Sequence, residues 1–495
     1  MHEDELLLDD GDGLDGLDDR DDQGDLGDRG GLGGLGAELP TRAELDAYSG
    51  LLRRLRRLPL DHPVRLRTER EAESFVREGR HARRKARRAE VSAADAAALA
   101  GTATGAPGRR EDAPLALPAR PGPVAGLLRP RRCYVCKSLY HRVDGFYHAL
   151  CAACADDNRR RRGLRTDLTG RRVLLTGGRV KIGFQLALMM LRDGAELVVT
   201  SRFPRDTVRR FAAAEGSAEW LGRLTVVGID LRDPRQVLGL CEQLRAEGRP
   251  LDALVNNAAQ TLRRPPQAYA LLAEGERSEL PPGVAVQWAP GFRPLPALRG
   301  AWPAAELAHA TADGPDPAGG LALPVDEAGL LPDPAVANSW SARLGELDPA
   351  EVLETQLVNA LAPALLCDRL LPLLLASPHP RRYIVNVTAV EGRFEVRNKT
   401  SGHPHTNMAK AALNMLTRTS AAELAEQGVH MCAVDTGWIT DENPAPKKAR
   451  IAEHGFRTPL DIVDGAARVY DPIVRGEAGD PVAGVFLKDY REAAW

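Results

Sequence analysis

The residues that most clearly could do chemistry lie in a glycine turn between Val173 and Gly183, which reads VLLTGGRVKIG. Three apolar residues predict a buried strand, Gly177 and Gly178 follow it, and a helix is expected to begin near Ile182. Glycine lets the backbone bend tightly and approach a ligand, and the start of a helix presents unpaired N–H groups and a positive dipole end. The pattern therefore predicts a binding site for the pyrophosphate of a dinucleotide.

A second group of reactive residues is a pair of cysteine knuckles, CYVC and CAAC, with fourteen residues between them. Four thiolates at this spacing can reach the corners of a tetrahedron, which suits Zn²⁺. A disulfide is disfavoured in a cytosolic chain, and nothing else in the sequence supports an iron–sulfur cluster or a redox role. We therefore predict a zinc module with a structural rather than a catalytic role, whose ligands are Cys133, Cys136, Cys151 and Cys154.

Short apolar runs after the glycine turn predict the strands that must position these residues. They alternate with helical patterns such as FQLALMMLRDGA and ALNMLTRTSAAELAEQG, which is typical of a parallel, doubly wound α/β sheet of the Rossmann type. Ligands of such a sheet bind at the carboxyl ends of its strands. The expected strands beyond the first lie within 196–200, 224–230, 251–260, 383–389, 429–437 and 482–487.

The order of these elements, with TGG and then IG at the first turn and NNAA after the fourth strand, resembles the short-chain dehydrogenase/reductase family. The resemblance runs from about Asp167 to the C-terminus, apart from a Pro-, Gly- and Ala-rich insertion at 262–348. We expect the insertion to form a lid or an interface, or else a variable surface excursion. The resemblance implies a nicotinamide cofactor, a small-molecule substrate and a homo-oligomer that assembles through helices beside the sheet.

The resemblance also assigns cofactor contacts to the ends of several strands. Lys181 replaces the middle glycine of the family's TGxxxGxG pattern, as in the branch that contains pteridine reductases, where a basic residue meets the cofactor phosphates. Arg202 follows the second strand with no acidic neighbour, which favours the 2′-phosphate of NADP(H) over the free ribose of NAD(H). The implied cofactor residues are Thr176, Gly177, Gly178, Arg179, Lys181, Ile182, Gly183, Ser201, Arg202, Asp230, Leu231, Asn257, Ala258, Ala259, Lys410, Thr436, Gly437 and Trp438.

The family's catalytic positions are only partly matched in this chain. Asn359 matches the asparagine that organises a water relay, and Lys410 matches the lysine that lowers the pKa of a tyrosine and holds the nicotinamide ribose. Thr406 stands at the position of that tyrosine, and Ala389 stands at the position of the serine, with Thr388 one residue earlier. A threonine hydroxyl is a far poorer acid than a phenol, so the usual proton donor is missing.

Three interpretations of this missing donor stay open. In the first, another group donates the proton, with His403, His405 and Tyr383 as candidates; His403 stands seven residues before Lys410, which is the spacing of the tyrosine in the related enoyl-reductase branch. In the second, Lys410 and the substrate suffice for hydride addition to an activated C=N or C=C bond. In the third, the domain binds NADP(H) without turnover, as a sensor or scaffold whose zinc module contacts a partner. The first two make the protein an NADP-dependent oxidoreductase, which is the function we predict.

Composition and charge limit which other partners and locations the protein can have. The 495 residues carry a net charge of −2, so bulk charge predicts no polyanionic partner, and arginine runs are usually solvated faces, which disfavours nucleic-acid binding. No apolar run approaches the roughly 20 residues of a membrane span, so we expect a cytoplasmic protein without a membrane partner. Three single cysteines in apolar elements, Cys241, Cys367 and Cys432, are expected to be small buried hydrophobes.

Shifts in composition along the chain predict its domain organisation. Acidic and glycine-rich residues with little to bury predict a disordered head, and leucines and alanines at helical spacing follow it. The predicted parts are the disordered head at 1–40, a basic helical segment at 41–100, a linker at 101–129, the zinc module at 130–158 and the Rossmann domain at 167–495.

Overall fold

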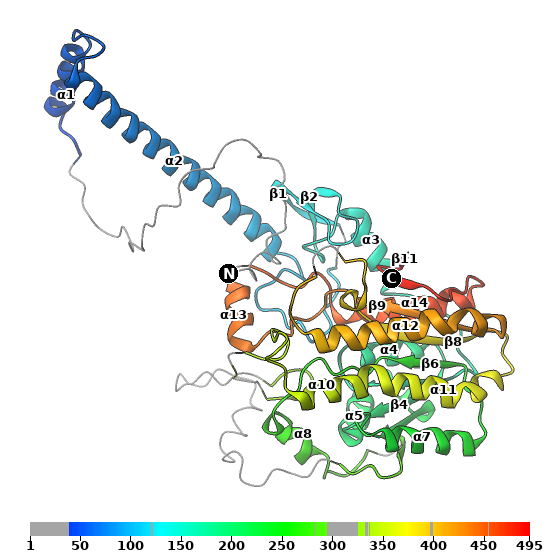
Figure 1. The fold of residues 1–495 in the computed structure, drawn as a ribbon. Coiled ribbons are helices and arrows are strands. Elements are labelled where there is room, and N and C mark those ends of the chain that lie inside the picture. The colour runs from blue at the N-terminus through cyan, green and yellow to red at the C-terminus, as the bar shows by residue number, and fades with distance from the viewer. Residues whose placement is uncertain are drawn as a thin grey trace. The chain divides into compact units, whose positions relative to one another are not determined.

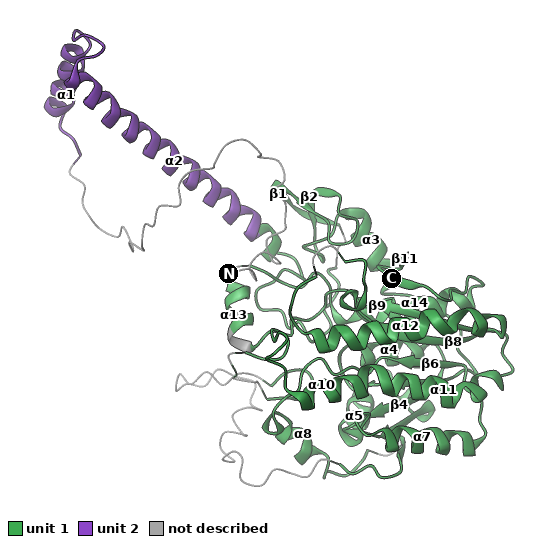
Figure 2. Cartoon of the chain, viewed as in Figure 1, with its two compact units in different colours: residues 1–7, 98–495 green, residues 8–97 purple. Residues whose placement is uncertain are grey.

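The computed structural model of this chain describes residues 39–119, 122–281, 283–294, 325–331, 335, 337–396, 399–453 and 455–495. The acidic head predicted at 1–40 lies outside these residues except for its last two, and so does the middle of the insertion predicted at 262–348. The chain divides into two compact units, one of residues 8–97 and one of residues 98–495 together with 1–7 (Figure 2).

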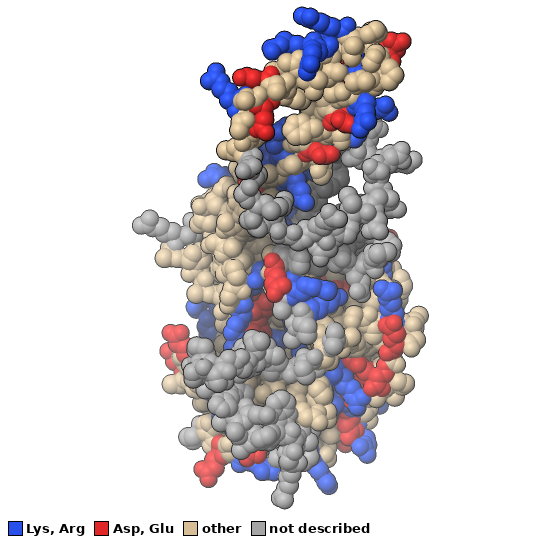
Figure 3. All heavy atoms as spheres, turned by 90° about the vertical axis from the view of Figure 1, so that its left-hand side faces the viewer, with Lys and Arg blue, Asp and Glu red and all other residues tan. Residues whose placement is uncertain are grey.

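The smaller unit is helical in its described part. It contains α1 (Arg42–Leu55) and most of α2 (Pro63–Ala100). α1 begins at a capping box, in which the Thr41 hydroxyl accepts a hydrogen bond from the Glu44 amide and the Glu44 carboxylate accepts one from the Thr41 amide. Lys, Arg, Asp and Glu side chains lie among other residues on the visible surface of this unit (Figure 3), and Arg–Glu pairs one helical turn apart support α2.

In the described part of the chain, the larger unit forms a nine-stranded sheet in the order β11-β10-β9-β8-β6-β3-β4-β5-β7 (Figure 1). Its neighbouring strands are parallel, except that β10 and β11 form an antiparallel hairpin at one edge. The strand order reverses at β3, so the predicted doubly wound Rossmann sheet is confirmed. The strands are β3 (Arg172–Thr176), β4 (Glu196–Ser201), β5 (Leu224–Gly228), β6 (Ala253–Asn256), β7 (Ala285–Trp288), β8 (Arg382–Thr388), β9 (Val429–Asp435), β10 (Phe486–Lys488) and β11 (Arg491–Ala493).

Helices cover both faces of this sheet because the central strands are apolar on both sides. One face packs against α4 (Lys181–Arg192), α5 (Pro204–Ala212), α6 (Ser217–Trp220) and α14 (Ile462–Glu477). The other face packs against α7 (Pro234–Glu247), α11 (Ala362–Leu375) and α12 (Pro404–Glu426). Further short helices are α8 (Ala270–Gly275), α10 (Pro349–Gln356) and α13 (Ala445–Glu453), and a π-helical turn, η4 (Leu357–Leu361), joins α10 to α11.

The insertion contributes a strand to the sheet, which the sequence analysis did not predict. β7 lies within the insertion and pairs in parallel with β5, so that Gly228 stands opposite Trp288. The Trp288 ring stacks on Phe292 with centroids 5.7 Å apart, and a Cβ on Gly228 would lie 2.6 Å from that indole. Glycine at 228 therefore lets the added edge strand pack closely.

The four cysteines lie in a small module built from the hairpin β1 (Pro123–Arg132) and β2 (Leu139–Asp144) and from α3 (Ala152–Arg161). The stretch before it, expected to be a linker, makes ordered contacts on both sides. The Thr104 hydroxyl donates to the Phe146 carbonyl at 2.9 Å, and the Leu115 amide donates to the Asp461 carboxylate at 3.0 Å. These contacts tie the stretch to the module and to α14.

One helix of the described chain, the continuous run Pro349–Leu375 of 27 residues, is long and apolar enough to cross a membrane by length and composition. Charged residues at Glu351, Glu354, Asp368 and Arg369 interrupt the helix, so it meets this test by its average composition and not by one unbroken apolar run. Half of its most apolar window is buried inside the folded chain, where its α11 part packs in one core with the sheet and α7. The long apolar pattern thus reflects the buried side of a core helix.

Candidate functional site

The turn after β3 is hydrogen-bonded to residues that directly follow the neighbouring strand β6. The Thr176 hydroxyl accepts hydrogen bonds from the amides of Asn257 and Ala258, both at 3.0 Å. The Asn257 side chain donates in return to the carbonyl oxygens of Thr176 and Gly177, at 3.1 and 3.0 Å. Asn257 and Ala258 therefore lie against the glycine turn at the reversal of strand order, where sheets of this class bind their ligands.

The glycines of the turn are required by its own packing. Gly177 has φ +71°, and a Cβ there would lie 2.8 Å from the Cα of Ala258. A Cβ on Gly183 would lie 2.1 Å from the Gly177 carbonyl oxygen, and one on Gly178 would lie 2.6 Å from the Val199 side chain. The turn therefore presents bare backbone beside the N-terminus of α4, which suits an anionic phosphate.

The two cations of the turn have different partners. Lys181 has φ +53°, a left-handed backbone that strains a side chain, and its Nζ lies 3.8 Å from a Glu442 carboxylate oxygen. Burial alone would raise the pKa of Glu442, but the charges of Lys181 and Lys448 lower it. Arg179 donates to the Asp206 carboxylate at 2.7 Å, so its charge is already paired with α5.

The end of β4 presents a guanidinium to the same region. Ser201 is buried, and its Oγ accepts a hydrogen bond from the Phe203 amide at 3.0 Å. The Arg202 guanidinium lies over the rings of Phe203 and Tyr269, 5.7 and 5.2 Å from their centroids. Arg202 forms no ion pair with any residue that the structure describes. The rings hold the side chain in place and leave its N–H groups for an anion.

The ends of β5 and β6 carry the next predicted cofactor residues. Asp230 accepts hydrogen bonds from Arg232; burial alone would raise the pKa of Asp230, but the bonds and charge of Arg232 lower it. Leu231 is buried beside it, and Ala259 is exposed after β6. Ile182, by contrast, packs against α14, so its side chain serves the core.

The loop after β9 follows the same edge of the sheet. Gly437 has φ +82°, and the Thr436 hydroxyl lies 3.5 Å from the Gly437 carbonyl oxygen. The Trp438 amide donates to the Tyr134 hydroxyl at 2.9 Å, and the Trp438 indole packs against Phe456 with centroids 4.8 Å apart. A residue of the cysteine module therefore holds the backbone of this loop.

Lys410 places a buried amine at the carboxyl end of β8. It lies on α12 and is 6% exposed, and its Nζ donates to the Val387 carbonyl at 2.9 Å. Burial lowers the pKa of Lys410 to about 8, although the Glu391 carboxylate opposes this shift. A buried amine with such a pKa can hold or release a proton near neutral pH.

The other predicted catalytic side chains differ in their contacts. The Thr388 hydroxyl lies 3.5 Å from the Lys410 carbonyl oxygen. Thr406 lies one helical turn before Lys410 on α12, and its buried hydroxyl has no hydrogen-bond partner among the described residues. Asn359 is bound on both sides to the backbone of Gln260, at 2.7 and 2.9 Å, so it braces the segment after β6.

The predicted alternative proton donors are less favourably placed. The His403 ring stacks on Trp340 with centroids 4.1 Å apart, and its Nδ1 lies 2.8 Å from the Trp340 carbonyl oxygen. Burial lowers the pKa of His403 and of His405, and the His405 ring has no hydrogen-bond partner in the described chain. Tyr383 lies at the start of β8, away from the carboxyl edge, and donates to Glu477. The suggestion of Tyr383 as a donor was therefore wrong.

The last part of the insertion covers the start of α12. The Asn338 side chain donates to the Glu442 carbonyl at 2.8 Å, and the Ser339 hydroxyl donates to Glu351 of α10. The His403 amide donates to the Ala342 carbonyl at 2.9 Å. Residues 338–342 thus join the loop after β9 to α10 and α12.

The four cysteines of the two knuckles converge on one point. Their Sγ atoms all lie within 4.8 Å of one another, and those of Cys136 and Cys151 are 3.6 Å apart. A tetrahedral Zn²⁺ with Zn–S bonds of about 2.3 Å needs sulfur–sulfur separations of about 3.8 Å, so the cluster fits one ion. The remaining cysteines are buried singly, as predicted; they are Cys241, Cys367 and Cys432.

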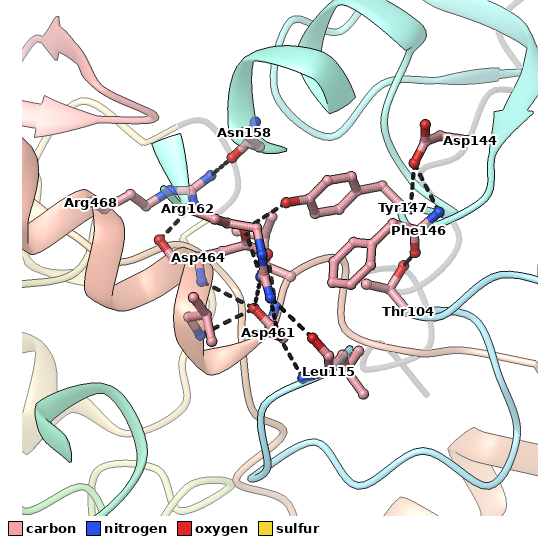
Figure 4. Close-up of polar contacts among 12 residues, drawn as sticks. Thr104, Leu115, Asp144, Phe146, Tyr147, Asn158, Arg162, Asp461, Asp464 and Arg468 are labelled. Carbon is pink, nitrogen blue, oxygen red and sulfur yellow. Dashed lines mark hydrogen bonds and ion pairs between the residues drawn. The ribbon is translucent and has the colours of Figure 1, made fainter. Parts of the chain in front are cut away.

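A buried polar network joins the cysteine module to α14 (Figure 4). The Arg162 guanidinium pairs with Asp461 and Asp464, and the Tyr147 hydroxyl donates to Asp464 at 2.6 Å. The Arg468 side chain donates to Asn158 of α3 at 2.9 Å. These groups lie out of solvent, so each bond is costly to lose.

Replacing Tyr147 by phenylalanine tests how much this network stabilises the fold. Tyr147 is fully buried, so water cannot replace its hydroxyl as the donor to Asp464. We expect Y147F to lower the free energy of unfolding by about 1–3 kcal/mol in urea denaturation. The matched control is Tyr48→Phe on the exposed face of α1, which should leave the curve unchanged. Equal curves for Y147F and the unsubstituted chain would contradict this expectation.

Comparison with known proteins agrees with this geometry. The family model described as short chain dehydrogenase matches residues 171–274, and the one described as Enoyl-(Acyl carrier protein) reductase matches residues 317–458. The C-signal protein of Myxococcus xanthus is 30% identical over 142 residues, which are 29% of this chain and 82% of that protein. This chain belongs to the short-chain dehydrogenase/reductase family.

Two further proteins are similar over longer stretches. The uncharacterized protein R665 of Acanthamoeba polyphaga mimivirus is 29% identical over 372 residues, covering 69% of this chain and 71% of that protein. Among solved structures, an NADPH-bound carbonyl reductase from chicken fatty liver is 17% identical and covers 67% of this chain and all of its own, with a TM-score of 0.40. Neither likeness identifies a substrate for this short-chain dehydrogenase/reductase.

In this member of the short-chain dehydrogenase/reductase family, the candidate site includes a carboxyl group that the sequence analysis missed. Glu391 lies two residues after Ala389, and it is the carboxylate that acts on the pKa of Lys410. Burial raises the pKa of Glu391, and the charge of Asp435 adds to that shift. The sequence shows an acid after a strand, but only the packing of β8, β9 and α12 reveals that it is partly buried and acts on the amine.

Proposed function

We propose that this chain is an NADP(H)-dependent oxidoreductase that acts on a small organic substrate. The observation that carries the proposal is the buried amine of Lys410, which lies at the carboxyl edge of the sheet with the bare glycine turn. A buried amine costs stability, so its presence at a ligand-binding edge favours a functional role. When bound, NADPH would supply a hydride to the substrate.

The preference for NADP(H) rests on Arg202. Its guanidinium lies over two rings at the end of β4 and has no ion-pair partner in the described chain, so it can meet a 2′-phosphate. Lys181 stands at the start of α4, where the pyrophosphate would lie, and its contact with Glu442 is long at 3.8 Å. Arg179 is paired with Asp206, so we assign it to positioning of the turn.

We infer that Lys410 is the proton source that replaces the missing tyrosine. Its ammonium would release one proton to the substrate oxygen or nitrogen while the substrate carbon gains the hydride, and the neutral amine would regain a proton from solvent. One N–H is bonded to Val387, which leaves two for other acceptors. The Thr388 hydroxyl lies near the Lys410 backbone, and the Thr406 hydroxyl, one helical turn earlier on α12, has no hydrogen-bond partner in the described chain; both would orient the substrate.

The pH dependence of reduction tests this role. Burial lowers the pKa of Lys410 to about 8, and only the protonated amine can donate. We expect kcat/KM for reduction to be flat below this pH and to fall about tenfold per pH unit above it. The rate of the reverse oxidation should instead rise with pH up to the same value. A reduction profile that stays flat two units above the pKa would contradict the assignment.

The proposed activity is tested by a substrate screen with NADPH. The chain is mixed with NADPH and with ketones, imines and enones in turn, and loss of NADPH absorbance is followed. We expect turnover with at least one of these classes. Turnover with none of them, in a chain that binds NADPH, would contradict an oxidoreductase and favour a sensor or scaffold.

We also propose that the four-cysteine cluster binds one Zn²⁺ with a structural role. Its sulfur separations suit a tetrahedral ion, and Cys133 and Cys154 are part of the module's buried core. Purified chain is expected to hold one zinc per molecule, and chelation should lower its melting temperature by several degrees because the module's fold depends on the ion.

Cysteine variants supply the control for this metal measurement. Cys136→Ser removes one proposed ligand, whereas Cys367→Ala removes a buried cysteine outside the cluster. Zinc content should fall in the first and stay unchanged in the second. A chain that carries no metal and keeps its melting temperature in chelator would contradict the proposal.

A further inference from the structure

The cysteine module and the Rossmann domain share one apolar core. Tyr140, Phe146 and Leu150 of the module lie in the same buried cluster as Ile439 and Leu460, which belong to the segment between β9 and α14. This segment begins with the loop Thr436–Trp438. The module therefore packs against the segment that contains this loop.

Tyr134 makes the direct contact between the module and the loop. Its hydroxyl accepts the Trp438 amide at 2.9 Å, and it lies 3.5 Å from the position that a Cβ on Gly437 would take. The Lys488 amine lies 5.5 Å from the centroid of the Tyr134 ring and pairs with Asp435, the last residue of β9. The ring is thus held among the end of β9, the end of β10 and the loop.

The same tyrosine is fixed by the cysteine cluster. It lies between Cys133 and Cys136, and its amide donates to the Ala149 carbonyl at 2.8 Å, which links the two knuckles. The Cys151 amide donates to the Cys133 Sγ at 3.3 Å. An ion held by the four thiolates would therefore fix the backbone on both sides of Tyr134.

We propose that Tyr134 is a positioning residue that couples the four-cysteine cluster to the loop Thr436–Trp438, so that the module completes the nicotinamide side of the site. This rests on the proposed function and on the family resemblance, which places Thr436, Gly437 and Trp438 in the loop that covers the nicotinamide. Gly437 is in the left-handed region at φ +82°, so the loop depends on an anchor to hold one conformation. Tyr134 supplies that anchor from about 300 residues away in the chain.

The test compares Tyr134→Phe with Tyr140→Phe in the full chain. Both remove one phenol hydroxyl from the module, but the Tyr140 hydroxyl donates to the His148 carbonyl at 2.6 Å, inside the module. Hydrogen exchange should accelerate at the Trp438 amide in Y134F and in chelated wild type, but not in Y140F. The dissociation constant for NADPH should rise about two- to tenfold in Y134F and in chelated wild type, and stay unchanged in Y140F.

Two results would overturn the proposal. One is an unchanged exchange rate at Trp438 in Y134F, and the other is equal acceleration in Y134F and Y140F, which would indicate general loosening of the module. Exchange at Trp438 is read without nucleotide, so it reports on the coupling even if the chain binds no NADPH. If the chain binds no NADPH, the proposed function fails, but the exchange rate at Trp438 still decides whether Tyr134 positions the loop.

Discussion

Replacing Lys410 by methionine is expected to lower kcat for reduction by about 10²–10⁴-fold, because the chain loses its proton source. Methionine matches the length of the aliphatic stem, so the buried site stays filled. Loss of the amine should also weaken NADPH binding, since the family places this lysine against the nicotinamide ribose. Single-turnover reduction and nucleotide titration separate the two effects.

Lys399 offers a matched control for this change. It is exposed, and its amine donates to backbone carbonyls of the segment after β8, Glu391 among them. Lys399→Met removes an amine from the same neighbourhood without touching the proposed proton source, so its kcat should stay close to that of the wild type. Wild-type turnover in K410M would show that the proton comes from elsewhere.

Replacing Arg202 by alanine is expected to weaken NADPH binding about 10–100-fold and to leave NADH binding nearly unchanged. The guanidinium would make charge-assisted hydrogen bonds to the 2′-phosphate, which NADH lacks. The matched control is Arg205→Ala on α5, because the Arg205 guanidinium already donates to the Ser278 carbonyl at 2.5 Å. Equal losses for both nucleotides in R202A would indicate damage to the turn and contradict a phosphate contact.

The fold could be predicted because most of its strands can be recognised from short stretches of the sequence. Runs such as VLLT and ELVVT are apolar on both faces, and only a parallel sheet covered by helices buries both. The edge strand β7 gave no such signal, since AVQW is short, lies in a Pro- and Gly-rich insertion and is only partly buried. Its place follows from pairing with β5, which is a tertiary contact.

Site residues could be predicted where they depend on neighbours in the sequence, and not where segments far apart in the sequence meet. The glycines and Asn257 follow from the spacing of one turn and one strand end. Arg179 was listed as a cofactor residue because it stands in the turn, and only the folded chain shows that it pairs with Asp206 on α5. Tyr134 gave no signal, because nothing in its neighbourhood shows that a loop 304 residues away needs a hydrogen-bond acceptor.

Titration of the purified chain with NADPH and with NADH tests the central claim most directly. Binding is followed by nucleotide fluorescence at equal ionic strength, because the phosphate contact is electrostatic. The account predicts saturable binding of NADPH at least about tenfold tighter than that of NADH, as expected for one charge-assisted phosphate contact. Absence of binding for both nucleotides would contradict it, because the glycine turn, Arg202 and Lys410 would then hold no cofactor.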